Sequence, residues 1–205
     1  MRTGAAKFLL LTDIIFMVLH VLYLKMDIGV MYSITLNGGY SEIFQYIKEF
    51  LIVILLLMLA FDRKQPIYLA WSLLFLYILI DDSMQLHENI SAYLAQTFDF
   101  KPMFRLKAVD FGELAVSAFF GGILFTLVGL AYWLTNAVVK QITKGLLLLV
   151  LSLAFFLVVV DMIHSMTPRG KSLFALIEDG GEMLIMSAIV YYIYLQHCLA
   201  ATKPK

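Results

Sequence analysis

Six long apolar segments divide this 205-residue chain, at residues 8–25, 44–61, 67–88, 110–134, 145–164 and 173–197. About 20 apolar residues in a helix cross the hydrocarbon core of a bilayer, where no water can satisfy backbone N–H and C=O groups. The segments are too long and too uniformly apolar to be alternating barrel strands. The sequence therefore predicts an all-α, polytopic integral membrane protein, a six-transmembrane-helix bundle that forms a single transmembrane domain over residues 1–205.

Composition limits the partners of such a chain. It is 62% hydrophobic and 15% charged, whereas soluble domains are about 45–50% apolar and about 25% charged. Fifteen basic and fifteen acidic residues cancel, which argues against nucleic acid as a partner. The single cysteine, Cys198, excludes an intramolecular disulfide and an iron–sulfur cluster. The expected partner is the lipid bilayer, and a homo-oligomer or a larger membrane complex stays open.

Lysine and arginine in the connections predict the orientation of the chain. With the N-terminus inside, the cytoplasmic segments hold eight of the fifteen basic residues and the outer segments hold six, a small bias in the direction that the positive-inside rule requires. We expect both termini in the cytoplasm and the protein in the bacterial inner membrane. The longest connection, at about 89–109, mixes aromatic and basic residues, and we expect it in the outer interface.

Carboxylates are concentrated in the apolar segments. Ten of the fifteen lie inside or at the rim of the second to sixth segments, where Lys48 is the only basic residue. Insertion of an ionisable side chain at the bilayer centre costs at least about 2.5–3.5 kcal/mol of free energy, so we expect each of these residues to have a structural or functional role. Because consecutive spans alternate in direction, the acid-bearing ends should all meet at one face of the bundle, which the orientation above makes the outer one.

Four segments carry two polar side chains three residues apart, hence on one helix face: Gln85 with Glu88, Asp110 with Glu113, Asp161 with His164, and Asp179 with Glu182. We expect these faces to point into a common interior. Acids also suit helix N-termini through capping and the helix dipole. That purely structural reading explains Asp110 but not Asp81 or Asp161, which lie near helix C-termini.

Carboxylates and histidine projecting from several helices are the ligands with which a bundle holds metal ions. The predicted metal ligands are Asp81, Glu88, Asp110, Glu113, Asp161, His164, Glu178, Asp179 and Glu182, with His20, Glu49, Asp82 and His87 as possible additional ones. The expected cofactor is one or two divalent ions of iron, zinc or manganese. The alternative for so many neighbouring acids is multiple protonation.

At the level of these motifs the chain resembles the carboxylate-bridged di-iron bundles of the ferritin-like and alternative-oxidase type. It departs from them because Asp161 and His164 are its only carboxylate-x-x-His pair. The segments 81–88 and 178–183 also resemble small, uncharacterised bacterial multi-pass membrane proteins, which implies no known activity. Membrane zinc hydrolases of the alkaline-ceramidase and adiponectin-receptor type are similar in architecture, but this chain lacks their paired histidines on the last helix.

The leading hypothesis is a metal-binding membrane enzyme, an oxidoreductase or hydrolase that acts on a lipid, quinone or other membrane-soluble substrate near the outer leaflet. One alternative is a proton or cation transporter, since buried acids also line such pathways. Residues 67–80, 122–134 and 145–160 carry no charge, however, so we expect no continuous polar path to the inner face. A non-catalytic subunit of a larger complex is the other alternative.

Overall fold

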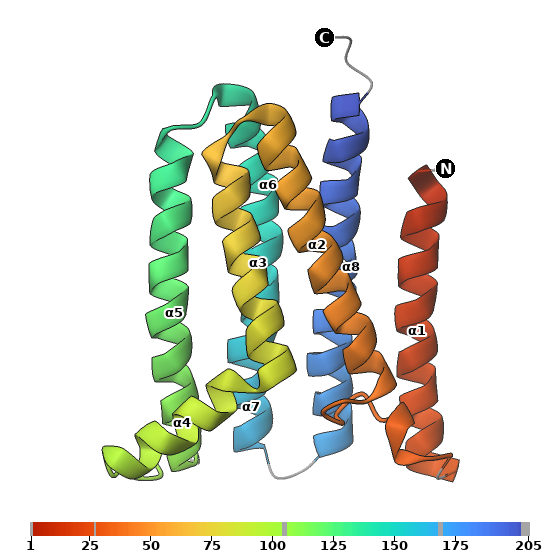
Figure 1. Ribbon diagram of the computed structural model, residues 1–205. Helices are drawn as coiled ribbons and strands as arrows, with labels where there is room; N and C mark the ends of the chain where they lie inside the picture. Colours follow the sequence, from red (N-terminus) through yellow and green to blue (C-terminus); the bar gives the residue numbers. More distant parts are fainter. Residues whose placement is uncertain (1, 27, 104–105, 168–169, 202–205) are drawn as a thin grey trace.

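The computed structural model describes residues 2–26, 28–103, 106–167 and 170–201, and these contain helices but no β-strand. Long helices stand side by side, and both termini lie at the same end of the bundle (Figure 1). In chain order the elements are α1 (Arg2–Met26), η1 (Val30–Tyr32), α2 (Tyr40–Arg63), α3 (Pro66–Met84), α4 (Leu86–Thr97), α5 (Ala108–Trp133), α6 (Ala137–Ala154), η2 (Phe155–Val160), α7 (Asp161–Met166) and α8 (Lys171–Ala201).

Five segments are long and apolar enough to cross a membrane: Thr3–Met26, Tyr40–Arg63, Pro66–Met84, Ala108–Trp133 and Ala137–Met166. They correspond to the first five predicted spans, so the predictions of an all-α fold and of membrane-spanning helices are confirmed. The sixth predicted span corresponds to α8, which is not among the five. Its first half carries the acids Glu178, Asp179 and Glu182, and the helix packs against α1, α2 and α6.

The third predicted span ends earlier than expected. Gln85 adopts a left-handed backbone conformation, with φ 53° and ψ 41°, which ends α3 and begins α4. The turn is held because the Asp81 carboxylate accepts the backbone N–H of His87 over 2.8 Å, one of the free donors in the first turn of α4. The prediction that Gln85 and Glu88 share one face of the third span is therefore wrong, because the chain turns at Gln85 and α4 runs at an angle to α3 (Figure 1).

The fifth predicted span begins earlier than residue 145. Asn136 caps α6, since its side-chain oxygen accepts the backbone N–H of Val139 over 3.0 Å. Towards its other end the helix widens into a π-helical segment, η2, directly before Asp161. Short π segments inside α-helices often occur at functional sites. This one supplies part of the wall described below.

An apolar core fills the half of the bundle nearer the termini. Ile52 and Leu56 of α2, Trp71 and Phe75 of α3, and Ile189 of α8 are each at most 1% exposed. The polar ends of α2, α3, α5, α7 and α8 all lie at the opposite end, together with α4 (Figure 1). The alternation of helix direction thus brings the acids to one end, as the sequence predicts.

Candidate functional site

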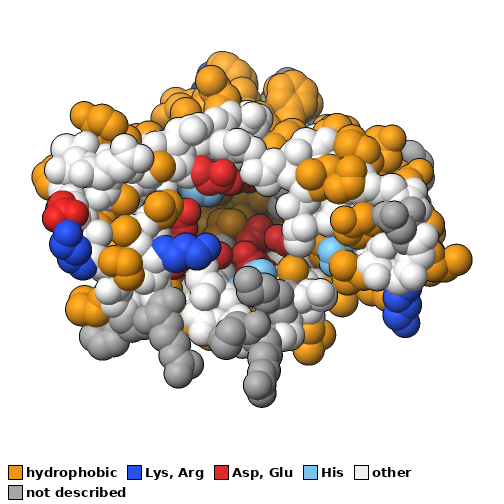
Figure 2. All heavy atoms as spheres, turned by 90° about the horizontal axis from the view of Figure 1, so that it is seen from below, with side chains coloured by type: hydrophobic (Ala, Val, Ile, Leu, Met, Phe, Trp, Pro, Cys, Tyr) orange, Lys and Arg blue, Asp and Glu red, His pale blue; other side chains and the backbone are white. Residues whose placement is uncertain are grey.

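A cavity of about 560 Å³ is sunk into the end of the bundle that lies away from the termini. Seen from that end, the molecule has a hollow whose walls are acidic (Figure 2). Eight carboxylates line the cavity: Glu42, Asp82, Glu88, Glu113, Asp161, Glu178, Asp179 and Glu182. His87 is part of the wall, and the lining residues include no lysine or arginine. The described wall of this cavity therefore carries eight carboxylates against one imidazole, that of His87.

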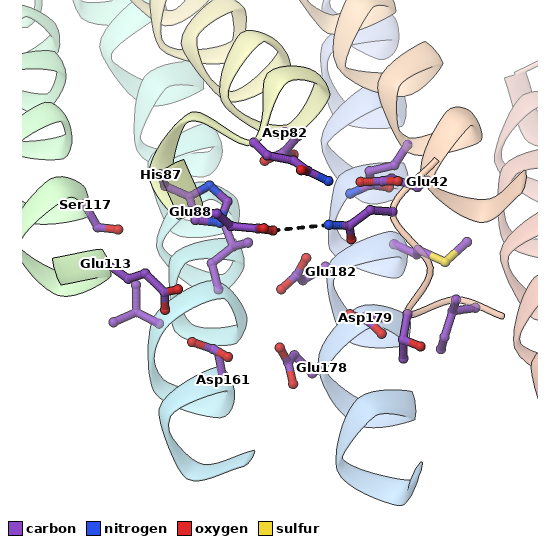
Figure 3. A pocket seen from close by; sticks show the side chains of 18 of the residues that line it. Glu42, Asp82, His87, Glu88, Glu113, Ser117, Asp161, Glu178, Asp179 and Glu182 are labelled. Carbon is purple, nitrogen blue, oxygen red and sulfur yellow. Dashed lines mark hydrogen bonds between the residues drawn. The ribbon is translucent and has the colours of Figure 1, made fainter. Parts of the chain in front are cut away.

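Six helices supply these acids. Figure 3 shows side chains from α2, the end of α3, the start of α4, α5, α7 and α8 directed towards the same space. Glu113 of α5 interacts electrostatically with Asp161 of α7 and with His87 of α4. Asp161 in turn interacts with Glu178 of α8. Groups that could bind a metal thus follow one another from α4 through α5 and α7 to α8, near enough to interact electrostatically, and we call this set the donor row.

His87 stands at one end of this row, at the corner between α3 and α4. Its Nδ1 lies 3.0 Å from Oδ2 of Asp81, and this hydrogen bond raises the pKa of His87 to about 9. Ligand atoms of Asp81, Asp82 and His87 all lie within 4.8 Å of one another. Two carboxylates and one imidazole at this spacing form a set that can share a metal ion, with Asp81 orienting the ring.

His164 stands at the other end of the row. Its Nδ1 lies 2.6 Å from Oε2 of Glu178, and its ring stacks on Phe174 with centroids 6.2 Å apart. His164 does not itself line the cavity, whereas Glu178 and Asp161 do. A carboxylate thus fixes the ring orientation of each of these two histidines, His87 and His164.

Glu49 lies behind the wall and has unusual surroundings. It is completely buried, and neither of its carboxylate oxygens has a hydrogen-bond partner among the described residues. The group faces the carboxyl of Asp82, and Glu182 is also near enough to act on it electrostatically. A buried carboxylate without a donor is costly, so Glu49 requires either a proton, which it can share with Asp82, or a nearby cation.

Lys48, the sequence neighbour of Glu49, makes its hydrogen bonds with other residues. Its Nζ donates to Oδ1 of Asp13 over 3.1 Å and to the carbonyl oxygen of Met183 over 2.9 Å. Ser187 donates to the other oxygen of Asp13 over 2.5 Å. Lys48 and Asp13 are both fully buried. This ion pair connects α1, α2 and α8 and is balanced within itself.

Two predicted ligands have structural partners outside the cavity. Asp110 accepts the backbone N–H of Lys107 over 2.8 Å and so caps α5, as the structural reading of helix N-termini expects. Nδ1 of His20 accepts the backbone N–H of Ile34 over 3.3 Å, which holds the segment after η1 against α1. Neither residue lines the cavity.

The predicted ligands omitted Glu42 and the segment Ile34–Asn37, both of which line the cavity. Glu42 shares a helix face with Gln45 and Glu49, at spacings of three and seven residues, and that pattern was visible in the sequence. The segment has no such signal. Nδ2 of Asn37 nevertheless donates to Oε1 of Glu88 over 3.3 Å, which joins two parts of the cavity wall (Figure 3).

Comparison with known proteins identifies the family of this chain but no activity. A family model described as a domain of unknown function (DUF8692) matches residues 8–198. Neither the curated proteins nor the solved structures gave a match to this chain. The match includes every described residue of the cavity wall and all of the apolar spans except the first five residues of Thr3–Met26. The chain belongs to the DUF8692 family.

Proposed function

We propose that this protein binds one or two divalent metal ions in the acidic cavity and uses them as a membrane-embedded enzyme. The observation that carries the proposal is the absence of lysine and arginine from a described wall that holds eight carboxylates. Like charges this close in a bundle need either protons or a cation. Carboxylate oxygens together with two oriented imidazoles suit iron, zinc or manganese.

The proposed metal ligands fall into two groups at the ends of the donor row. Asp81, Asp82 and His87 would form one group, and Asp161, His164 and Glu178 the other. Glu113 of α5 and Glu182 of α8 also line the cavity. A metal held there would supply Lewis-acid or redox chemistry. The carboxylates position it, and the surrounding helices restrict the access of water.

The membrane arrangement belongs to the same proposal. We take α8 as a sixth span, because both termini lie at one end of the bundle (Figure 1) and an even number of crossings returns the chain to its starting side. With the small positive-inside bias, the termini would be cytoplasmic and the cavity would open at the outer face of a bacterial inner membrane. The proposed substrate is a lipid, a quinone or another membrane-soluble molecule.

Metal analysis tests the proposal directly. Protein purified without chelator and then offered iron, zinc or manganese should retain one or two equivalents after desalting. Glu182→Gln and His164→Ala should both lower the retained amount to less than half an equivalent. Asp62→Asn is the matched control, because Asp62 is an exposed acid at the opposite end of α2. Wild-type protein without stoichiometric metal, or pocket variants that retain as much as wild type, would refute the proposal.

Transport of protons or cations is the second candidate. Glu49 favours it, because this buried acid interacts with Asp82 of the cavity wall and is the sequence neighbour of Lys48, which pairs with Asp13. Beyond that pair, buried apolar side chains such as Leu56 and Phe75 fill the core, and an ion there would lose its hydration without a replacement. Transport therefore ranks second. Liposomes that pass protons or divalent cations at a rate abolished by Asp161→Asn would reverse the order.

A further inference from the structure

The helices around the cavity do not close its wall evenly. α5 packs against α3 and α4, and within the described residues it makes at most marginal contact with α6, η2 and α7. On the other side, η2 packs against α6 and α8. Gly181 of α8 makes this packing close, since a Cβ there would overlap the ring of Phe156. The π segment is therefore packed on α8, and among the described residues the space between η2 and α5 is not closed by helix packing. We call this space the gap.

Residues on both sides of this gap also line the acidic cavity. Leu114 and Ser117 belong to α5, and Leu157 and Val158 belong to η2. Leu157 is 39% exposed, and Ser117 is exposed as well. Both elements lie in segments long and apolar enough to span a membrane, so in the proposed membrane arrangement the gap would face lipid chains. The cavity thus has an uncharged side next to lipid and acidic walls further in.

We propose that this gap is a lateral portal through which a long-chain amphiphile enters the cavity from the membrane. Its oxygen-bearing headgroup would meet the metal held by the acids, and its chain would remain between Leu114 and Ser117 on one side and Leu157 on the other. The inference rests on the proposed metal site and names the substrate class for it. A fatty acid fits this chemistry, because a carboxylate binds hard cations whereas the acidic cavity without metal repels it.

Photolabelling in nanodiscs tests the portal with a defined probe. The probe is palmitic acid with a diazirine beside its carboxyl end, and the labelled peptides are identified by mass spectrometry. In metal-loaded wild-type protein we expect labels on cavity-lining peptides that contain Leu114 or Met162. Leu157→Trp should obstruct the gap and lower this labelling about tenfold. Ser117→Trp obstructs it from the opposite side and covers the case in which the first variant does not fold.

Leu151→Trp is the matched control, because Leu151 is 52% exposed, lies six residues before Leu157 and does not line the cavity. It should label like wild type. Labels confined to the outer surface of wild-type protein, or cavity labels that both portal variants leave unchanged, would overturn the portal. Metal content measured on the same samples separates the two proposals. Bound metal without portal-dependent labelling refutes the portal alone, whereas a lack of bound metal refutes the metal site on which it rests.

Discussion

Removal of Lys48 should strongly destabilise the protein. In the Lys48→Met variant, Asp13 keeps only the hydrogen bond from Ser187, which spans 2.5 Å in the intact protein. The carboxylate of Asp13 is fully buried, so it must either stay charged without its cation or take up a proton. Uptake of a proton at pH 7 by a group with a reference pKa of about 3.9 costs about 4 kcal/mol. This agrees with the roughly 3–5 kcal/mol lost when one partner of a buried pair is removed.

The double variant Lys48→Met/Asp13→Leu should recover most of that loss. Two apolar side chains then replace the pair, and Ser187 can donate to the carbonyl oxygen of Met183, four residues earlier on the same helix. Replacement of a buried ion pair by apolar residues is often neutral, so we expect the double variant within about 1 kcal/mol of wild type. The coupling energy between the two positions should be about 3 kcal/mol or more.

Equilibrium unfolding in mixed detergent micelles measures these differences. Trp71 is fully buried in the core and reports unfolding by its fluorescence. Lys144→Met is the matched control, because Lys144 is exposed on α6, and it should stay within about 0.5 kcal/mol of wild type. A loss below about 1 kcal/mol in Lys48→Met, or a double variant as unstable as the sum of the single variants, would refute the view that the pair is balanced within itself.

Further predictions concern the packing of α5 and the protonation of the cavity. Gly112→Ala should cost about 1–3 kcal/mol in the free energy of unfolding, because its Cβ would lie 2.5 Å from the backbone oxygen of Ser91. Gly121→Ala has nothing within 4 Å and should not destabilise the protein. Metal affinity measured by calorimetry should rise with pH up to about 9, because a metal must displace the proton that Asp81 helps to hold on His87. An affinity independent of pH between 6 and 9 would exclude His87 as a ligand.

The sequence predicted the helical membrane fold because apolar length is a strong signal over about 20 residues. It failed where one residue changes the direction of the chain. Nothing in the apolar pattern distinguishes Gln85 from a helical residue, and its left-handed conformation depends on contacts made by Asp81. The π segment is equally hard to predict, since Phe155–Val160 is as apolar as an ordinary helix. Its place depends on a contact between distant parts of the chain, because the ring of Phe156 packs against Gly181 of α8.

The site was predictable in part for a related reason. Spacing and direction of helices identify the end at which acids meet, and Glu113, Asp161 and Glu182 are found on one cavity wall. Spacing does not show which carboxylate has a local partner. Asp110 has the same spacing signal as the others, yet it caps its own helix. The hydrogen-bond partner of His20 is the backbone N–H of Ile34, in a segment without periodicity. No pattern in the sequence predicts this contact.

The two buried charged regions of this protein differ in a way that bears on function. Where a carboxylate is buried deep between helices, at Asp13, the chain supplies Lys48 and a hydroxyl group and leaves no charge uncompensated. Directly beside Lys48, Glu49 receives no donor within the described structure, and it faces a wall of further carboxylates without lysine or arginine. A fold that can place a lysine at this depth could also have placed one at the cavity. Because the described wall of the cavity lacks lysine and arginine and the cavity opens at one end of the bundle (Figure 2), the metal ion that we propose would balance its carboxylates from outside.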